Sequence, residues 1–371
     1  MNSSFAPLWL ATTMLVGVPT VSRAQDAEPV VPLAADADAE PAAAEAERKP
    51  TNRLIEEIVV TAQKREENLQ DVPISINAFT AETLDARGIV DPKDLPQVTP
   101  GLYIGANAGY TITYLRGVGS DAYLLGDPSV ALYIDGVYFP FAHGQAQNFG
   151  SIERVEVLKG PQGTLFGRNA VGGAISVTTE APSFTDAAGS VQVGYGSYDD
   201  LQTKAQINLP LGDTFAIGIS GLYNAADNYR DGRVAGEPLP QEVTKGARVR
   251  LRWAPIESLD ITLSGFRLEQ TGTGTMFATN GDPSPTFSAL IQPQTGIDGV
   301  NDAPDYFSLE NTVFYGQATL NLDAFDIKLI GSDQNVQTAA LYDFDGSPTP
   351  LVFFEVPKQG ADVQTAELQV L

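Results

Sequence analysis

The 371-residue chain is long enough for two domains or for one large β architecture, and its 35 glycines and 25 prolines favour many strands and turns over helices. A net charge of −24 argues against a nucleic-acid partner, because no basic surface is available to neutralise phosphates. The absence of cysteine excludes a thiolate metal site, a catalytic thiol and a disulfide framework. A single histidine, His143, leaves no means of assembling a histidine metal site or a catalytic triad, so we predict no metal, no cofactor and no enzyme activity.

The amino-terminal segment has the pattern of a signal peptide. Phe5–Val18 is mostly apolar but shorter than a bilayer span, and Ser22 and Ala24 are small residues placed for cleavage after Ala24. No Lys or Arg precedes the apolar run, so an apolar leader without a targeting role is the alternative. We predict a signal peptide at 1–24, followed by a disordered linker of Ala, Pro and acidic residues at 25–54.

Residues 55–62 are β-prone and follow directly on this linker. A short strand on a flexible tether is suited to adding itself to the edge of another protein's sheet. The alternative is that 55–62 is simply the first strand of the domain that follows.

Residues 63–182 mix strand and helix patterns and predict a small α+β domain. Thr80 is placed to cap a helix that ends at Gly88, and Asp135-Gly136 has the composition of a type I′ turn. The expected elements are strands at Val72–Phe79, Thr111–Arg116 and Val130–Ile134, a helix at Ala81–Arg87 and a further turn at Asp91–Val98.

Ser151–Thr179 is the densest pattern in the chain. Alternation at Ile152–Val157 predicts a strand, five glycines interrupt it, and a second strand resumes at Ala174–Thr179. So many glycines predict positive φ angles or close backbone approach, which indicates an ordered segment packed inside something larger.

Eight long alternating strands are predicted after Ser183. The candidates are 188–198, 201–209, 214–225, 247–253, 258–270 (with a bulge near Gly265), 314–322, 324–337 and 362–371. They are longer than strands of soluble proteins, and after the first connection long and short connections alternate, as in a membrane barrel whose two ends face different environments. The fold class is therefore mainly β: a small α+β domain followed by antiparallel transmembrane strands in 183–371. A soluble β-sandwich is the weaker alternative.

Several segments resemble those of TonB-dependent outer-membrane receptors. E-E-I-V-V-T-A at 56–62 resembles the TonB box, D-V-P-I-S-I-N-A-F at 71–79 and Y-L-R-G-V at 114–118 resemble plug segments, and V-A-L-Y-I-D-G-V-Y at 130–138 and the 152–179 segment resemble the most recognisable parts of the plug. The resemblance is dense over 55–181 and loose beyond it.

The resemblance implies energised import across the outer membrane of a Gram-negative bacterium. A scarce substrate, expected to be a ferric siderophore and otherwise cobalamin or a glycan, binds outside, and TonB with its inner-membrane partners drives uptake. The implied TonB contact is Glu57, Ile58, Val59, Val60, Thr61 and Ala62. Substrate specificity is expected in Asn107–Tyr110, Asp121–Asp127 and 271–310.

The resemblance also implies a set of plug-motif and plug–barrel contact residues. These are Arg116, Gly117, Asp135, Gly136, Glu153, Arg154, Glu156, Gly160, Gly163, Gly167, Arg168, Gly172 and Gly173. A buried arginine needs a partner, so we expect a carboxylate on the inner wall, with Glu367 a candidate, to pair with Arg116 or Arg168. The alternative is that Glu367 only hydrates the lumen wall. Asp135 is expected to serve its turn.

Eight strands are fewer than the family pattern of about 22, and a barrel of about eight cannot enclose a plug. We therefore expect a truncated product or a fragment, and a non-transporting remnant is an open alternative. A structural periplasmic β protein is the rival from another class, and a hydrolase is a distant third.

Overall fold

The computed structural model describes residues 12–13, 59–65, 67–89, 92–107, 110–120, 127–141, 152–227, 232–234, 237–238, 241–273, 299–301, 306–343 and 353–371. Met1–Met14 and Ile58–Leu371 form one unit, and Leu15–Glu57 forms a second unit of which no residue is described. The predicted linker and nearly all of the predicted signal peptide therefore lie outside the described residues, as do Glu57 and Ile58.

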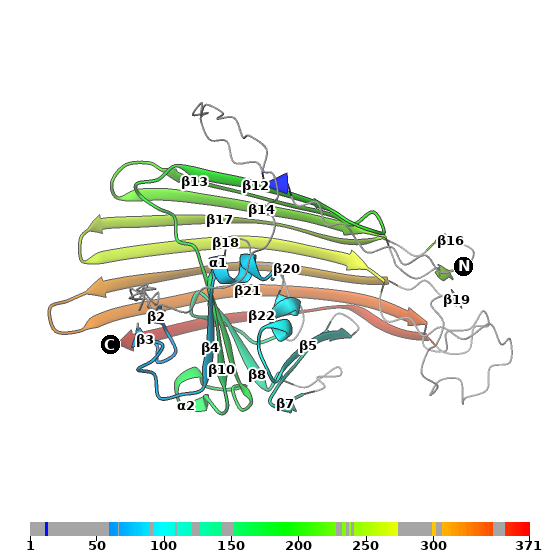
Figure 1. The fold of residues 1–371 in the computed structure, drawn as a ribbon, viewed down its shortest axis with the longest axis horizontal. Coiled ribbons are helices and arrows are strands. Elements are labelled where there is room, and N and C mark those ends of the chain that lie inside the picture. Colours follow the sequence, from blue (N-terminus) through cyan, green and yellow to red (C-terminus); the bar gives the residue numbers. More distant parts are fainter. Residues whose placement is uncertain are drawn as a thin grey trace, which may run out of the picture. The chain divides into compact units, whose positions relative to one another are not determined.

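The largest element is a nine-stranded antiparallel sheet whose order follows the chain (Figure 1). A two-residue strand, β1 (Thr12–Thr13), pairs with its first long strand. The other eight, here called the wall sheet, are β12 (Ala188–Tyr195), β13 (Leu201–Pro210), β14 (Phe215–Ala226), β17 (Glu242–Ile256), β18 (Leu259–Gly272), β20 (Tyr306–Asn321), β21 (Asp326–Asp343) and β22 (Phe353–Val370). All eight predicted strands are present, and the later ones extend well beyond their predicted ends.

The wall sheet has the reverse of the polarity found in a soluble sheet. On β17, Arg248 and Arg250 are 6% and 5% exposed, whereas Val249 between them is 45% exposed. The same alternation recurs on β18, where Thr262 and Ser264 are buried and Leu263 is exposed. At these positions of β17 and β18 the covered face is therefore polar, and the opposite face is apolar and open.

The predicted bulge at Gly265 is wrong. Gly265 pairs in register with Val249 on one side and with Phe314 on the other. A Cβ atom at Gly265 would lie only 3.0 Å from the Phe314 ring, so the glycine makes room for that ring. The irregularity between β17 and β18 lies instead between Trp253 and Ile256.

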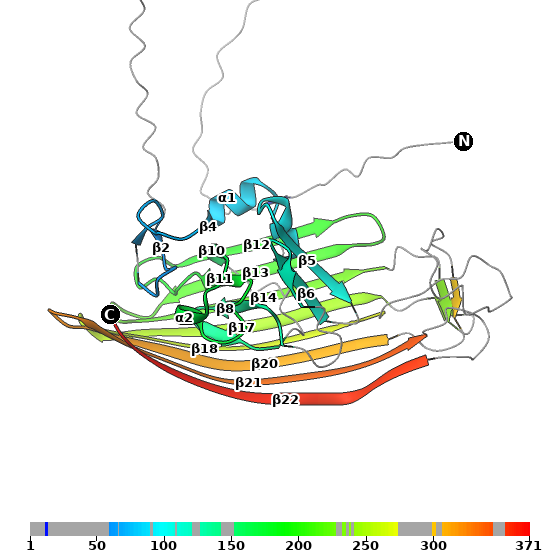
Figure 2. The same cartoon turned by 90° about the horizontal axis from the view of Figure 1, so that it is seen from below.

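The plug region (described residues 59–182) is built on a five-stranded sheet that lies on one face of the wall sheet (Figure 2). Its order is β4 (Ile76–Thr80), β10 (Ile152–Lys159), β11 (Gly173–Thr179), β8 (Val130–Ile134) and β9 (Val137–Phe139), with β11 and β8 parallel. The predicted strand at Val72–Phe79 is shorter than expected, since Pro73 lacks the N–H that a strand ladder needs.

Smaller elements complete the described residues. The helices are α1 (Ala81–Ala86), the 3-10 helix η1 (Pro92–Gln97) and α2 (Gly163–Phe166). Three small sheets contain β2 (Val59–Val60) with β3 (Glu67–Asn68), β5 (Leu102–Asn107) with β6 (Tyr110–Leu115) and β7 (Val118–Gly119), and β15 (Gly232–Val234) with β16 (Glu237–Pro238) and β19 (Gly299–Asn301). Among the described residues, no helix is long and apolar enough to cross a membrane.

The glycine-rich segment between β10 and β11 is ordered, as predicted. Gly160, Gly167 and Gly173 have φ angles of +97°, +70° and +146°. A Cβ atom at Gly173 would lie 2.2 Å from the carbonyl oxygen of Leu158, so this position excludes any side chain. Gly172 packs against β7, where a Cβ atom would lie 3.0 Å from the Val118 carbonyl oxygen.

One hydrophobic cluster joins the plug region to the wall sheet. Ile134 on β8 and Ile175 on β11 belong to the same buried cluster as Phe266, Val313 and Ile330 on the wall. Burial of apolar area from both parts stabilises their contact.

Candidate functional site

The segment Val59–Ala62, here called the docked segment, is packed into the plug region. Its strand β2 makes a two-residue ladder with β3. Val60 and Ala62 are fully buried, whereas Val59 is 40% exposed. The buried pair belongs to a cluster that includes Leu158, Phe166, Ala170 and Ala174.

Glu156 holds the docked segment through its side chain. Its Oε1 atom accepts hydrogen bonds from the backbone N–H of Thr61 at 2.8 Å and from Thr61 Oγ1 at 3.1 Å. Arg154 Nε donates to the same oxygen at 2.7 Å. Glu156 is fully buried, and its Oε2 atom has no partner within the described part of the chain. The carboxylate therefore joins β10 to a segment with which β10 makes no backbone–backbone hydrogen bond in the described part of the chain.

Lys64 follows the docked segment and reaches the wall sheet. Its Nζ atom lies 3.6 Å from Glu367 Oε1 on β22, and 4.6 Å and 4.8 Å from the ring centroids of Tyr133 and Phe166. Burial lowers the pKa of Lys64, and the Glu367 carboxylate partly offsets this shift. Burial also raises the pKa of Tyr133, whose hydroxyl donates to the Phe166 carbonyl.

Asp135 is the centre of a second contact between plug region and wall. It occupies the β8–β9 turn with a φ of +50°, and Gly136 follows at +80°, as a type I′ turn requires. Its carboxylate accepts hydrogen bonds from the N–H of Thr179 and from Thr179 Oγ1, both at 2.8 Å, and from Tyr315 Oη at 2.5 Å. Arg250 Nη2 lies 3.7 Å away. Asp135 therefore serves its turn, as predicted, and also contacts the wall sheet through Tyr315 and Arg250.

Two further contacts fix the same hairpin against the wall. Gln334 Nε2 on β21 donates to the Tyr138 carbonyl at 2.8 Å. Phe139 stacks on Phe266 of β18 with ring centroids 6.3 Å apart. The β8–β9 hairpin is thus held by an ionic, a hydrogen-bonded and an aromatic contact.

The two predicted plug arginines lie elsewhere. Arg116 Nη2 donates to Ser75 Oγ at 2.6 Å, and the Arg168 guanidinium lies 5.8 Å from the Tyr138 ring centroid. Within the described residues neither contacts a wall carboxylate, and the cation beside Glu367 is Lys64. The predicted pairing of Glu367 with Arg116 or Arg168 is therefore wrong, and Lys64 takes the place of the arginine. Lys64 projects toward β22, whereas Arg116 ends beside β4.

The remaining predicted residues make contacts or turns within the plug region itself. Glu153 pairs with Arg154 at 3.4 Å. Gly117 has a φ of +80°, whereas Gly163 opens α2 with nothing within 4 Å of its Cβ position.

Sequence reasoning did not single out Lys64, Arg250 or Tyr315. Alternation on β17 and β20 places Arg250 and Tyr315 on the covered face of the wall, which is a usable signal. No local pattern marks Lys64, whose partner lies at the far end of the chain. Among the described residues, no group of three His, Asp or Glu side chains could hold a metal ion.

A small α+β unit thus lies against the covered face of an open, curved antiparallel sheet. Residues 68–174 match the family model described as the TonB-dependent Receptor Plug Domain. The chain therefore carries the plug domain of TonB-dependent receptors, followed by antiparallel strands of the kind that form their barrels.

Curated relatives and solved structures agree with this assignment. The chain is 33% identical over 208 residues to the pesticin receptor of Yersinia pestis, which is 53% of this chain and 30% of that protein. It is 26% identical over 262 residues to the ferrioxamine B receptor of Salmonella typhimurium, covering 66% of this chain and 34% of the relative. It matches the crystal structure of the ferric yersiniabactin uptake receptor FyuA from Yersinia pestis with a TM-score of 0.68 at 24% identity, over 80% of this chain and 46% of that one. The chain thus spans less than half of the length of each.

Proposed function

We propose that the protein acts in TonB-coupled uptake at the outer membrane, with a ferric siderophore as its substrate. The observation that carries the proposal is the docked segment. Within the described residues, its hydrogen bonds are a two-residue ladder with β3, the bonds to the Glu156 side chain and one turn bond from the Lys64 N–H to the Thr61 carbonyl. Such a strand can leave its site and pair with the sheet edge of a partner, which here is TonB.

The polarity of the wall sheet supports a place in a membrane. Its open face carries apolar side chains on successive strands, among them Val191, Ile219, Leu263, Phe314 and Leu368. A face of this kind suits lipid, since outer-membrane strands alternate apolar residues outward with polar residues inward. Export to that membrane through a signal peptide at 1–24 remains part of the proposal.

The relatives support a siderophore as the substrate class. The ferrioxamine B receptor and the ferric yersiniabactin uptake receptor carry iron complexes in their names. Cobalamin and glycans are the competing substrates within the same function. Retention of iron-labelled ferrioxamine B by the purified full chain, with cobalamin as the second arm, tests this choice. Retention of cobalamin alone would overturn the siderophore assignment.

Binding to the periplasmic part of TonB tests the proposed partner. Val59→Pro removes a backbone donor that strand pairing needs, and Val59 is exposed enough for the change to spare the core. Val59→Ala is the matched control, because it shortens the same side chain and keeps the donor. We expect Val59→Pro to abolish capture of the full chain and Val59→Ala to retain it. Equal capture of both variants would refute the docking role of this segment.

A further inference from the structure

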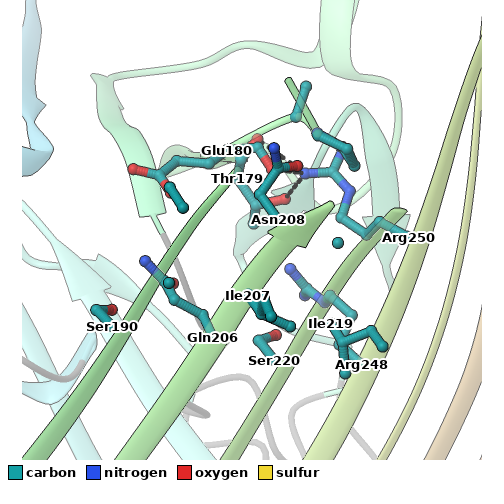
Figure 3. A pocket seen from close by; sticks show the side chains of 15 residues that line it. Thr179, Glu180, Ser190, Gln206, Ile207, Asn208, Ile219, Ser220, Arg248 and Arg250 are labelled. Carbon is teal, nitrogen blue, oxygen red and sulfur yellow. Dashed lines mark hydrogen bonds between the residues drawn. The ribbon is translucent and has the colours of Figure 1, made fainter. Parts of the chain in front are cut away.

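A cavity of about 330 Å³ lies between the wall sheet and the segment that leaves the plug region (Figure 3). Thr179–Pro182 forms one side, and β12, β13, β14 and β17 form the other. This volume is within the range of about 300–1,000 Å³ that small-molecule sites occupy. Arg248 and Arg250, two residues apart on β17, both line the cavity.

Arg250 is fixed in place but not fully used. Its Nη1 atom donates to Thr179 Oγ1 at 2.6 Å, to the Thr179 carbonyl at 3.0 Å and to the Glu180 carbonyl at 2.5 Å. Its Nη2 atom faces Asp135 at 3.7 Å. The buried Nε atom has no partner within the described residues. One donor of a rigidly held guanidinium is therefore left over.

Arg248 is still less satisfied. It is 6% exposed, and its guanidinium lies 5.4 Å from the Phe266 ring centroid. In the described part of the chain no carboxylate forms an ion pair with it, and its buried Nη2 atom has no hydrogen-bond partner. Arginine cannot shed its proton in a protein, so a full positive charge stays buried, which is costly unless an anion compensates it.

The next arginine on the same face shows the usual arrangement. Arg252 Nε and Nη2 both donate to Asp260 Oδ2, at 2.9 Å and 2.7 Å. The strand therefore places three arginines in a row, of which the last has its own carboxylate and the first has none.

The rest of the cavity wall carries neutral polar side chains and one acidic side chain, that of Glu180. Ser190, Gln206 and Ser220 line it from β12, β13 and β14. Asn208 is already used, because its Nδ2 atom donates to the Ser183 carbonyl at 3.1 Å and its Oδ1 atom accepts from the Ser183 N–H at 3.0 Å.

We propose that this cavity is a binding site for a small oxyanion, a carboxylate or phosphate group held by Arg248 and Arg250. A planar guanidinium is suited to both groups, and charged hydrogen bonds of this kind are short and strong. The anion would neutralise Arg248 and use the spare donor of Arg250. This site does not depend on the uptake function. No residue of the docked segment lines this cavity, although Arg250 and Thr179 also line a second cavity that Thr61 borders.

Thermal unfolding of the full chain in detergent tests the site. Sodium phosphate is one probe and citrate the other, each compared with sodium chloride at matched ionic strength. A ligand that binds only the folded chain raises the unfolding temperature. We expect a rise with one or both probes, and a dissociation constant weakened about tenfold or more in Arg248→Gln, which loses a charged hydrogen bond. A rise with phosphate alone assigns a phosphate, and a rise with citrate alone assigns a carboxylate.

Two variants separate binding from folding. Arg252→Gln on the same strand is the matched control and should bind the probe as the native chain does. Gln206→Glu supplies a negative charge within the cavity, so it should stabilise the chain without a probe and remove the response to one. The proposal is refuted if neither probe raises the unfolding temperature of the native chain, or if Arg248→Gln and Arg252→Gln respond equally.

Discussion

Removing the Asp135 carboxylate should loosen the plug region from the wall sheet. Asp135→Ala deletes the acceptor of three hydrogen bonds and leaves Arg250 without its ion-pair partner. Asp135→Asn keeps the shape and tolerates the positive φ of the turn, but it removes the charge.

The size of the effect follows from burial. The Asp135 and Arg250 side chains are 3% and 6% exposed, so water screens the pair little. Removing one partner of a buried pair costs about 3–5 kcal/mol, because the other charge is left uncompensated. An alanine at a positive φ adds about 1–2 kcal/mol. We therefore expect Asp135→Ala to lose about 4–7 kcal/mol by these two contributions, and Asp135→Asn to lose less.

Urea unfolding of the full chain in detergent, followed by circular dichroism, measures these losses. Asp260→Asn is the control, since its pair with Arg252 is about one-third exposed and should contribute about 1 kcal/mol or less. Combining Asp135→Asn with Arg250→Gln should cost less than the sum of the two single changes, because the double variant leaves no buried charge unpaired. The reasoning is refuted if the free energy of unfolding of Asp135→Ala lies within about 0.5 kcal/mol of the native value. It is also refuted if the losses of Asp135→Asn and Arg250→Gln simply add in the double variant.

Three further predictions concern Thr61 in the docked segment, Lys64 just after it, and the glycine-rich segment between β10 and β11. Thr61→Ala removes the Oγ1 bond to Glu156 and should cost about 0.5–1.5 kcal/mol, seen as several-fold faster amide hydrogen exchange at 59–62; unchanged exchange would contradict it. Because the pKa of Lys64 is lowered in the folded chain, the unfolded chain binds more protons just below the ordinary lysine value of about 10.4, so stability should rise with pH there. Lys64→Met should flatten that rise in urea titrations, and an unaltered slope would assign the effect elsewhere. Gly173→Ala should prevent native pairing of β10 and β11, whereas Gly163→Ala should leave the yield of folded protein unchanged; similar yields would show that the Gly173 site can relax.

The wall strands could be predicted because alternation directly reports which face of a strand is covered. Their ends could not, since the alternation fades where the longer strands pass into their connections. β20 begins at Tyr306, eight residues before the predicted start at 314. The wrong prediction of a bulge at Gly265 has a different cause. In the sequence, a glycine that makes room for a neighbouring ring looks the same as a glycine at a bulge, and the neighbour is known only from the structure.

The contacts of the candidate site were harder to predict. The Asp135-Gly136 turn is a local signal and was found, but its second role depends on Thr179, Arg250 and Tyr315, which tertiary packing brings together. Lys64 and Glu367 are distant in the chain, so electrostatic need alone could not choose Lys64 over Arg116 or Arg168. The sequence predicted that wall carboxylates meet plug cations, and the partners required the structure.

The place of β4 in the plug sheet has a mechanical consequence. A force applied to the chain at Val59 would first open β2 from β3, then strip Thr61 from Glu156, and next reach β4. Among the described strands, β4 is an edge strand paired with β10 alone, and its ladder begins where Ile76 faces Leu158. The residue pairs between β4 and β10 would therefore separate one after another from Ile76 onward, and would not all break at the same time. The hairpin held by Asp135 lies at the opposite edge of the same sheet, so the plug has one edge that yields to traction and one that is anchored.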